Sequence, residues 1–142
     1  MPKSLFEGSE LAAAGETITA IVLDSNIVLK AGEERDHEFR IESDLTLSSE
    51  AGELVVHFAP YEHEPKPATH LNELAEIVNC RLSHACAYTD GVLRLVLEHE
   101  GGRMHVLTVE PDPRYEAWMY THKNYILACP AGGRLPGWQP ET

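Results

Sequence analysis

The chain contains 142 residues, and its 23 acidic side chains outnumber its 11 Lys and Arg residues, which gives a formal net charge of −12 at pH 7. Since typical domains contain roughly 100–200 residues, this length favours one compact domain. The charge argues against nucleic acid and membrane surfaces as partners, because proteins bind both through Lys and Arg. Hydrophobic residues make up 43% of the chain, which excludes a disordered acidic tail.

The N-terminal residues, the apolar runs and the cysteines bear on the compartment. Residues 1–11 contain no apolar run of signal-peptide length. No apolar run approaches the roughly 20 residues that cross a bilayer. Three cysteines, Cys80, Cys86 and Cys129, cannot all pair within one chain, and we expect them to be buried and reduced. These features predict a soluble, cytoplasmic protein.

The first half of the chain reads as short β segments. We treat residues 1–15 as a lead-in and residues 16–142 as a single globular domain. Within 37–42, Phe39 and Ile41 alternate with charged residues, which is typical of a strand with one face in water. Turn residues separate the expected strands, which are 17–23, 27–31, 37–42, 45–48 and 53–59.

One helix is expected after the proline-rich stretch 60–67. Its apolar residues recur at intervals that place them on one helical face, and they are Leu71, Leu74, Ala75 and Val78. Thr69 is a suitable N-cap residue. The pattern therefore predicts an amphipathic helix that covers a sheet.

The second half returns to β segments, expected at 82–89, 92–99, 103–110, 115–121 and 124–129. Asp90-Gly91 is a favoured pair for a two-residue type I′ turn, and Gly101-Gly102 provides a second two-residue turn. With those loop lengths, Glu98 faces His105 across the hairpin. We interpret that pair as a surface ion pair rather than as a proton-transfer couple.

These elements predict an α+β fold, namely a mainly antiparallel β-sheet or open barrel of short strands with one amphipathic helix. The stretches 18–29 and 82–93 are weakly similar, and each leads into a third strand. A duplicated three-strand meander would explain this similarity. The ordinary likeness of any two hairpins explains it as well.

Motifs for catalysis and cofactor binding are missing from the sequence. It contains no Gly-x-Ser-x-Gly elbow, no P-loop and no Gly-x-Gly-x-x-Gly. Cys129 has no adjacent histidine, although His84 or His122 could approach it in space, and we interpret it as a buried packing residue. We therefore expect no catalytic residues and no cofactor.

Histidines 57, 63 and 70 form a loose group that raises the question of a metal site. Glu62 and Glu64 flank His63, but the spacing does not match a structural zinc site, and no His-Glu-x-x-His helix is present. We interpret this stretch as a solvated polar loop and expect no metal.

The C-terminal stretch carries a family resemblance. Asp112-Pro113-Arg114-Tyr115-Glu116-Ala117-Trp118, then Cys129-Pro130-Ala131-Gly132-Gly133 and Trp138, together with the earlier Asp90-Gly91, resemble an uncharacterised family of small bacterial proteins. That family carries a domain of unknown function and is commonest in high-GC Gram-positive bacteria. The resemblance implies no enzymatic activity. It implies structural roles for Asp90, Gly91, Tyr115, Glu116, Trp118, Cys129, Gly132, Gly133 and Trp138.

Small acidic bacterial domains without catalytic motifs often look like immunity proteins, which bind and silence a toxin. The leading hypothesis is thus a non-enzymatic binding protein, most specifically an immunity protein that neutralises a basic toxin enzyme. Its partner-binding candidates are Glu33, Glu34, Asp36, Glu62, Glu64, Glu98 and Glu100. The alternatives are a small enzyme or ligand-binding β-barrel, and a homo-oligomeric scaffold. Solubility alone would also account for the charge.

Overall fold

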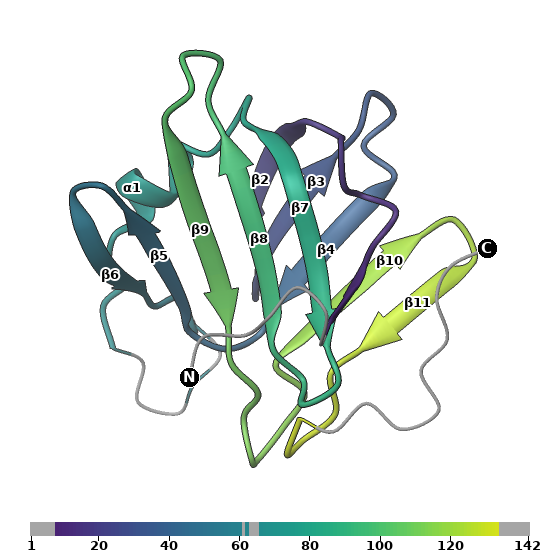
Figure 1. The fold of residues 1–142 in the computed structure, drawn as a ribbon. Coiled ribbons are helices and arrows are strands. Elements are labelled where there is room, and N and C mark those ends of the chain that lie inside the picture. The colour runs from purple at the N-terminus through teal and green to yellow at the C-terminus, as the bar shows by residue number, and fades with distance from the viewer. Residues whose placement is uncertain (1–7, 61, 63–65, 134–142) are drawn as a thin grey trace.

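A computed structural model describes residues 8–60, 62 and 66–133, which form two antiparallel sheets and one short helix (Figure 1). The first half contains β1 (Gly8–Glu10), β2 (Ile18–Leu23), β3 (Ile27–Ala31), β4 (His37–Ile41), β5 (Leu45–Ser49), β6 (Gly52–Val56) and α1 (Leu71–Ala75). The second half contains β7 (Arg81–Tyr88), β8 (Leu93–Glu98), β9 (Met104–Val109), β10 (Trp118–His122) and β11 (Tyr125–Ala128).

Each of the two sheets contains strands from both halves of the chain. Their strand orders are β1-β7-β8-β9-β5-β6 and β11-β10-β4-β3-β2. Each sheet therefore contains one three-strand meander. We call β2-β3-β4 the first meander and β7-β8-β9 the second meander. The hairpin β5–β6 of the first half extends the second meander, and the hairpin β10–β11 of the second half extends the first. The two sheets thus share one arrangement, in which the third strand of a meander pairs with the first strand of a hairpin from the other half of the chain.

The sheets meet where β2 and β7 begin. Ile18 N donates to Cys80 O at 2.8 Å, and Leu82 N donates to Glu16 O at 2.7 Å. Residues 8–15, which the sequence suggested were a lead-in, also belong to this region, because β1 pairs with β7 and both Leu11 and Ala13 are buried in the core.

The core lies between the two sheets, and buried and less buried residues alternate along β4, β5, β8 and β9, while β3 and β7 also bury consecutive residues. In β4 every second residue is buried, starting at His37, as expected of a strand with one face in the core. Trp118, Tyr120 and Phe39 are fully buried, and Phe39 stacks on Tyr120 with ring centroids 4.8 Å apart. Burying each such side chain contributes roughly 1.5–3 kcal/mol.

The predicted mainly antiparallel sheet is confirmed, whereas the α+β class and the amphipathic helix are not, because the fold is mostly antiparallel β with one short helix among the described residues. Only Leu71–Ala75 is helical, and the Thr69 hydroxyl donates to Val55 O instead of capping it. After the helix, Ile77 N donates to Leu74 O and Cys80 N donates to Ile77 O. Because such tight turns stack residues three apart, the buried side chains are Leu74, Ile77 and Cys80, while Ala75 is exposed. No helix among the described residues is long and apolar enough to cross a membrane.

The predicted register of the second meander is also wrong, by one residue. Gly91 N donates to Tyr88 O, and Gly102 N donates to His99 O, so each loop has three residues. Gly91 and Gly102 have φ values of 98° and 92°, which suits the left-handed third position of such a loop. His105 therefore pairs with Leu97 instead of Glu98, and the one-residue shift turns its side chain into the interior.

Candidate functional site

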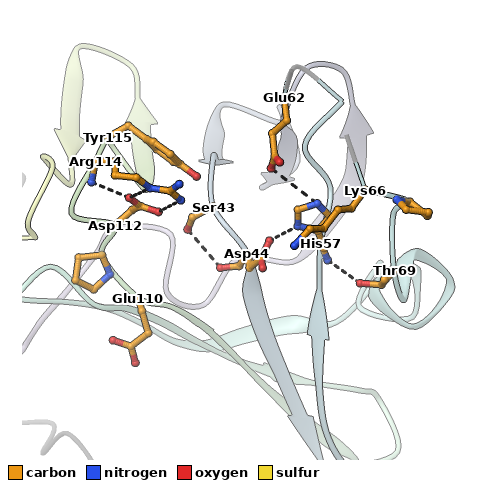
Figure 2. A pocket seen from close by; sticks show the side chains of 12 residues that line it. Ser43, Asp44, His57, Glu62, Lys66, Thr69, Glu110, Asp112, Arg114 and Tyr115 are labelled. Carbon is orange, nitrogen blue, oxygen red and sulfur yellow. Dashed lines mark hydrogen bonds and ion pairs between the residues drawn. The ribbon is translucent and has the colours of Figure 1, made fainter. Parts of the chain in front are cut away.

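A groove of about 860 Å³ opens where the chain crosses from one sheet to the other. Its walls come from the β4–β5 connection, the segment after β6 and the segment after β9 (Figure 2). We call it the crossover groove, and its lining residues are Ser43, Asp44, His57, Glu62, Lys66, Pro67, Thr69, Glu110, Pro111, Asp112, Arg114 and Tyr115.

His57 lies between two carboxylates on one wall of the crossover groove. Its Nδ1 is 2.6 Å from Asp44 Oδ1, and its Nε2 is 3.9 Å from Glu62 Oε1 (Figure 2). Thr69 fixes the backbone here, because its hydroxyl accepts a hydrogen bond from His57 N at 3.0 Å. Among the described residues no hydroxyl or thiol hydrogen-bonds His57 Nε2, so the histidine and Asp44 lack the nucleophile of an acyl-transfer triad.

The opposite wall carries an internal ion pair. The Arg114 guanidinium donates to both carboxylate oxygens of Asp112, at 3.2 and 3.1 Å. This contact, with smaller contributions from neighbouring groups, holds the pKa of Asp112 below its usual value. The Arg114 guanidinium also lies 5.2 Å from the centre of the Tyr115 ring. Arg114 is thus committed to Asp112 and Tyr115.

The crossover groove has an acidic balance. Its lining contains the carboxylates of Asp44, Glu62, Glu110 and Asp112 against the cations of Lys66 and Arg114. After the Asp112–Arg114 pair is set aside, the described lining holds the carboxylates of Asp44, Glu62 and Glu110 and one lysine, Lys66, and Asp44 is bonded to His57. A cationic ligand would therefore find a favourable potential in this groove.

The predicted acidic residues do not form one surface. Glu33 and Glu34 are exposed in the β3–β4 loop, and Glu100 is exposed in the β8–β9 loop. Both loops lie at the upper end of the view in Figure 1, whereas β9 runs down from its loop toward Glu110. A six-residue strand spans about 20 Å, so these loops are remote from the crossover groove.

The other acidic candidates have separate surroundings. Glu62 lines the crossover groove, and Glu98 pairs with Met104 at the end of β8. Asp36 Oδ2 lies 3.3 Å from His122 Nε2. Glu64 lies outside the described residues. Of the seven predicted partner-binding residues, the structure thus places Glu62 in the groove.

The residues of the family motif converge on a contact between two turns. Trp118 Nε1 donates to Gly91 O at 2.7 Å in the interior. A Cβ atom on Gly91 would overlap the Gly133 carbonyl, and one on Gly133 would overlap the backbone of Asp90. Gly132 N donates to Asp112 O at 2.8 Å, which ties this contact to the wall of the crossover groove. The motif therefore positions loops.

Two motif residues lie elsewhere, and one cannot be placed. Tyr115 lines the crossover groove. Glu116 is half-buried near Glu42, and burial, followed by the charge of Glu116, raises the pKa of the Glu42 carboxyl. Trp138 lies outside the described residues.

All three cysteines are free and buried, as predicted. Cys129 Sγ is 3.6 Å from Pro130 O, and burial raises the pKa of its thiol to about 11. The thiol is therefore protonated at neutral pH, in which form it is not a nucleophile.

A second polar cluster was missed by the sequence analysis. Asp36, His37 and His122 each present one potential metal-ligand atom, and these atoms lie within 4.8 Å of one another. His37 and His122 are opposed residues of β4 and β10. No local spacing could reveal them, because the two strands are separated by most of the chain. Of the histidines that were considered, His57 lines the crossover groove, His70 lies 3.4 Å from Glu73, and His63 lies outside the described residues.

Comparison with known proteins gave one match. A family model described as a family of unknown function (DUF6188) matches residues 9–139. No curated protein matches the chain. No solved structure matches it.

Proposed function

The chain belongs to this family of unknown function, DUF6188, and from that premise we propose that it is a non-enzymatic protein that binds a basic segment of a partner protein in the crossover groove. The observation that carries the proposal is the charge of the groove, whose described lining holds the carboxylates of Asp44, Glu62 and Glu110 beside Lys66 and the Asp112–Arg114 pair. Arg114 interacts mainly with Asp112, and its attraction to Glu62 is a smaller contribution.

The chemistry of the groove favours binding over catalysis. His57 is held by Asp44 at 2.6 Å and has Glu62 on its other side, so its surroundings suit a cationic ligand rather than a nucleophile. The walls are connecting segments carried on two packed sheets, which is where binding residues commonly lie. Acidic residues here would also speed association with a basic partner through complementary potential.

The finer form of the proposal is an immunity protein that neutralises a basic toxin enzyme. The net charge of −12 supports it, because an inhibitor that covers a phosphate-binding cleft gains from carboxylates placed against Lys and Arg. Its test is to search the neighbouring genes for a basic toxin enzyme and to co-express that enzyme with this chain, and the absence of such a gene would count against the immunity role. Restored growth is the expected result, and unchanged toxicity at matched expression would eliminate the immunity role.

The groove itself is tested with an oligo-arginine peptide as the probe, by fluorescence anisotropy at low and at physiological salt. We expect Glu62→Gln combined with Glu110→Gln to weaken binding about tenfold, or about 1.4 kcal/mol. The matched control is Glu33→Gln combined with Glu34→Gln, which removes the same charge from the exposed β3–β4 loop. Equal losses in both double variants, or binding that is insensitive to salt, would defeat the proposal.

A further inference from the structure

A partly buried polar cluster joins the first meander to the hairpin of the other half. His37 opens β4 and His122 closes β10, and the two residues are directly opposed in the sheet. Asp36 immediately precedes His37, and its Oδ2 atom lies 3.3 Å from His122 Nε2. We call Asp36, His37 and His122 the histidine cluster.

His37 is oriented in the manner of a metal ligand. Its side chain is 5% exposed, and its Nδ1 lies 2.8 Å from the buried Tyr120 hydroxyl. Histidines that bind metals usually have their second ring nitrogen held by such a hydrogen bond, which fixes the tautomer and the ring orientation. With Nδ1 on Tyr120, Nε2 is the nitrogen directed to a metal.

The surroundings also leave room for the His37 ring. A Cβ atom on Gly32 would lie 3.1 Å from His37 Cδ2, so a side chain at that position would press on the imidazole. Gly32 also has a φ of 93°, and a Cβ atom there would lie 3.4 Å from Asp36 Oδ1. Glycine adopts this backbone conformation without the strain of a Cβ atom.

The donor set selects the kind of ion. Two imidazole nitrogens and one carboxylate oxygen suit zinc and similar divalent transition metals rather than magnesium or calcium, which prefer oxygen ligands. We propose that the histidine cluster binds one zinc-class divalent ion through Asp36, His37 and His122, with a fourth position left to solvent or to a partner.

Binding requires a small change in the two rings. The imidazoles are stacked, with centroids 3.7 Å apart and planes 13° apart, and the three potential ligand atoms lie within 4.8 Å of one another. Zinc–ligand distances of roughly 2.0–2.2 Å require the ligand atoms to lie closer together than that limit. The ion would therefore open the stack by rotating the side chains, and it would cross-link β4 to β10.

The test is calorimetric titration of the full chain with zinc chloride after removal of metals with a chelator. We expect one ion per chain, and we expect His122→Gln to weaken its binding at least tenfold. His122 is chosen because its replacement spares the hydrogen bond between His37 and Tyr120. The matched control is His84→Gln, which removes another strand histidine that lies 3.8 Å from a carboxylate, that of Glu10.

A second readout separates a built site from adventitious binding. Cobalt(II) added to the chelator-treated chain should give a visible absorption band of a nitrogen- and oxygen-ligated ion, and Asp36→Asn should diminish it. Zinc binding should also raise the thermal midpoint of the wild type by several degrees, because a ligand that binds the folded state stabilises it. His122→Gln should lose most of this rise.

Three outcomes would overturn the proposal. The first is zinc binding by His122→Gln with the affinity of the wild type. The second is loss of binding in His57→Gln alone, which would move the ion to the crossover groove. The third is an equal, small loss in every histidine variant, including His84→Gln, which would mean adventitious binding only.

Discussion

The two three-strand meanders have the same strand order, and each buries one histidine, but only the histidine of the first meander has a side-chain hydrogen bond among the described residues. His37 is the first inward-facing residue of β4, and His105 is the first inward-facing residue of β9. Both are 5% exposed. Each is followed by two core residues at two-residue intervals, which are Phe39 and Ile41 in β4 and Leu107 and Val109 in β9.

The difference lies in the strand that pairs alongside. The hairpin β10–β11 places Tyr120 opposite Phe39 and His122 opposite His37, so His37 finds a hydroxyl and a second imidazole. In the other sheet, β5 places Leu47 opposite Leu107. Among the described residues neither ring nitrogen of His105 has a hydrogen-bond partner. The exchanged hairpin, rather than the meander itself, decides whether the histidine joins a polar cluster.

The largest predicted effect concerns the turns of the second meander. Gly91→Ala should destabilise the protein by about 3 kcal/mol or more, because it combines a positive φ with overlap of the Gly133 backbone. Gly102→Ala has a similar φ but open space around a Cβ atom, and it should cost only about 1 kcal/mol. Urea unfolding measures both, and equal costs would refute the contact between the two turns.

The second prediction concerns a substitution that removes His37 from the polar cluster of the first meander. His37→Leu should destabilise the protein by about 2 kcal/mol in the presence of a chelator, because the Tyr120 hydroxyl at 2.8 Å loses this hydrogen bond in the interior. Chemical unfolding followed by tryptophan fluorescence reports the change. An unaltered midpoint would mean that the hydrogen bond contributes nothing to stability.

The third prediction has the opposite sign and uses the corresponding residue. His105→Leu should stabilise the protein by about 1 kcal/mol, because it replaces a buried imidazole that lacks hydrogen bonds among the described residues with an apolar side chain of similar size. The same unfolding experiment applies. A loss of stability comparable to that of His37→Leu would show that the two histidines are equivalent after all.

The smallest predicted effect is a pH dependence from His105. Burial, followed by the charges of His99 and Arg103, lowers the pKa of this imidazole below 6.5, while Glu76 opposes the shift. The unfolded chain therefore binds the proton first, and stability is full above about pH 6.5 and falls with a slope of at most about 1.4 kcal/mol per pH unit as the pH drops toward the folded pKa.

His105→Leu isolates this contribution. The difference in unfolding free energy between the wild type and the variant should shift against the wild type between about pH 6.5 and pH 5. Urea melts at several pH values measure it. A difference that stays constant over this range would contradict the lowered pKa.

The strands were predictable because their signals are local. Alternation and turn residues placed strands at 27–31 and 37–42, and the structure has Ile27–Ala31 and His37–Ile41. Loop geometry was harder, because Asp90-Gly91 suits both a two-residue and a three-residue hairpin loop. The same holds for Gly101-Gly102, where one residue more in the loop decides whether His105 faces water or the core. The helix prediction placed Leu71, Leu74, Ala75 and Val78 on one helical face, whereas the buried side chains lie three residues apart, at Leu74, Ile77 and Cys80.

The sites were beyond sequence reasoning for a topological reason. The crossover groove joins Asp44, His57 and Asp112, and the histidine cluster joins Asp36 to His122. Both depend on hairpins that pair with the opposite half of the chain, and no local pattern encodes that exchange. Composition did predict the sign of the groove, because an excess of carboxylates reaches most surfaces of so acidic a chain.

The most direct test of the proposed function is amide chemical-shift mapping of the whole chain during titration with an oligo-arginine peptide. We expect the largest shifts on the lining of the crossover groove, around Asp44, His57 and Glu110, and we expect the β3–β4 and β8–β9 loops to shift little. Shifts spread evenly over every acidic loop, or centred on Glu33 and Glu100, would contradict a dedicated groove and leave the charge to solubility.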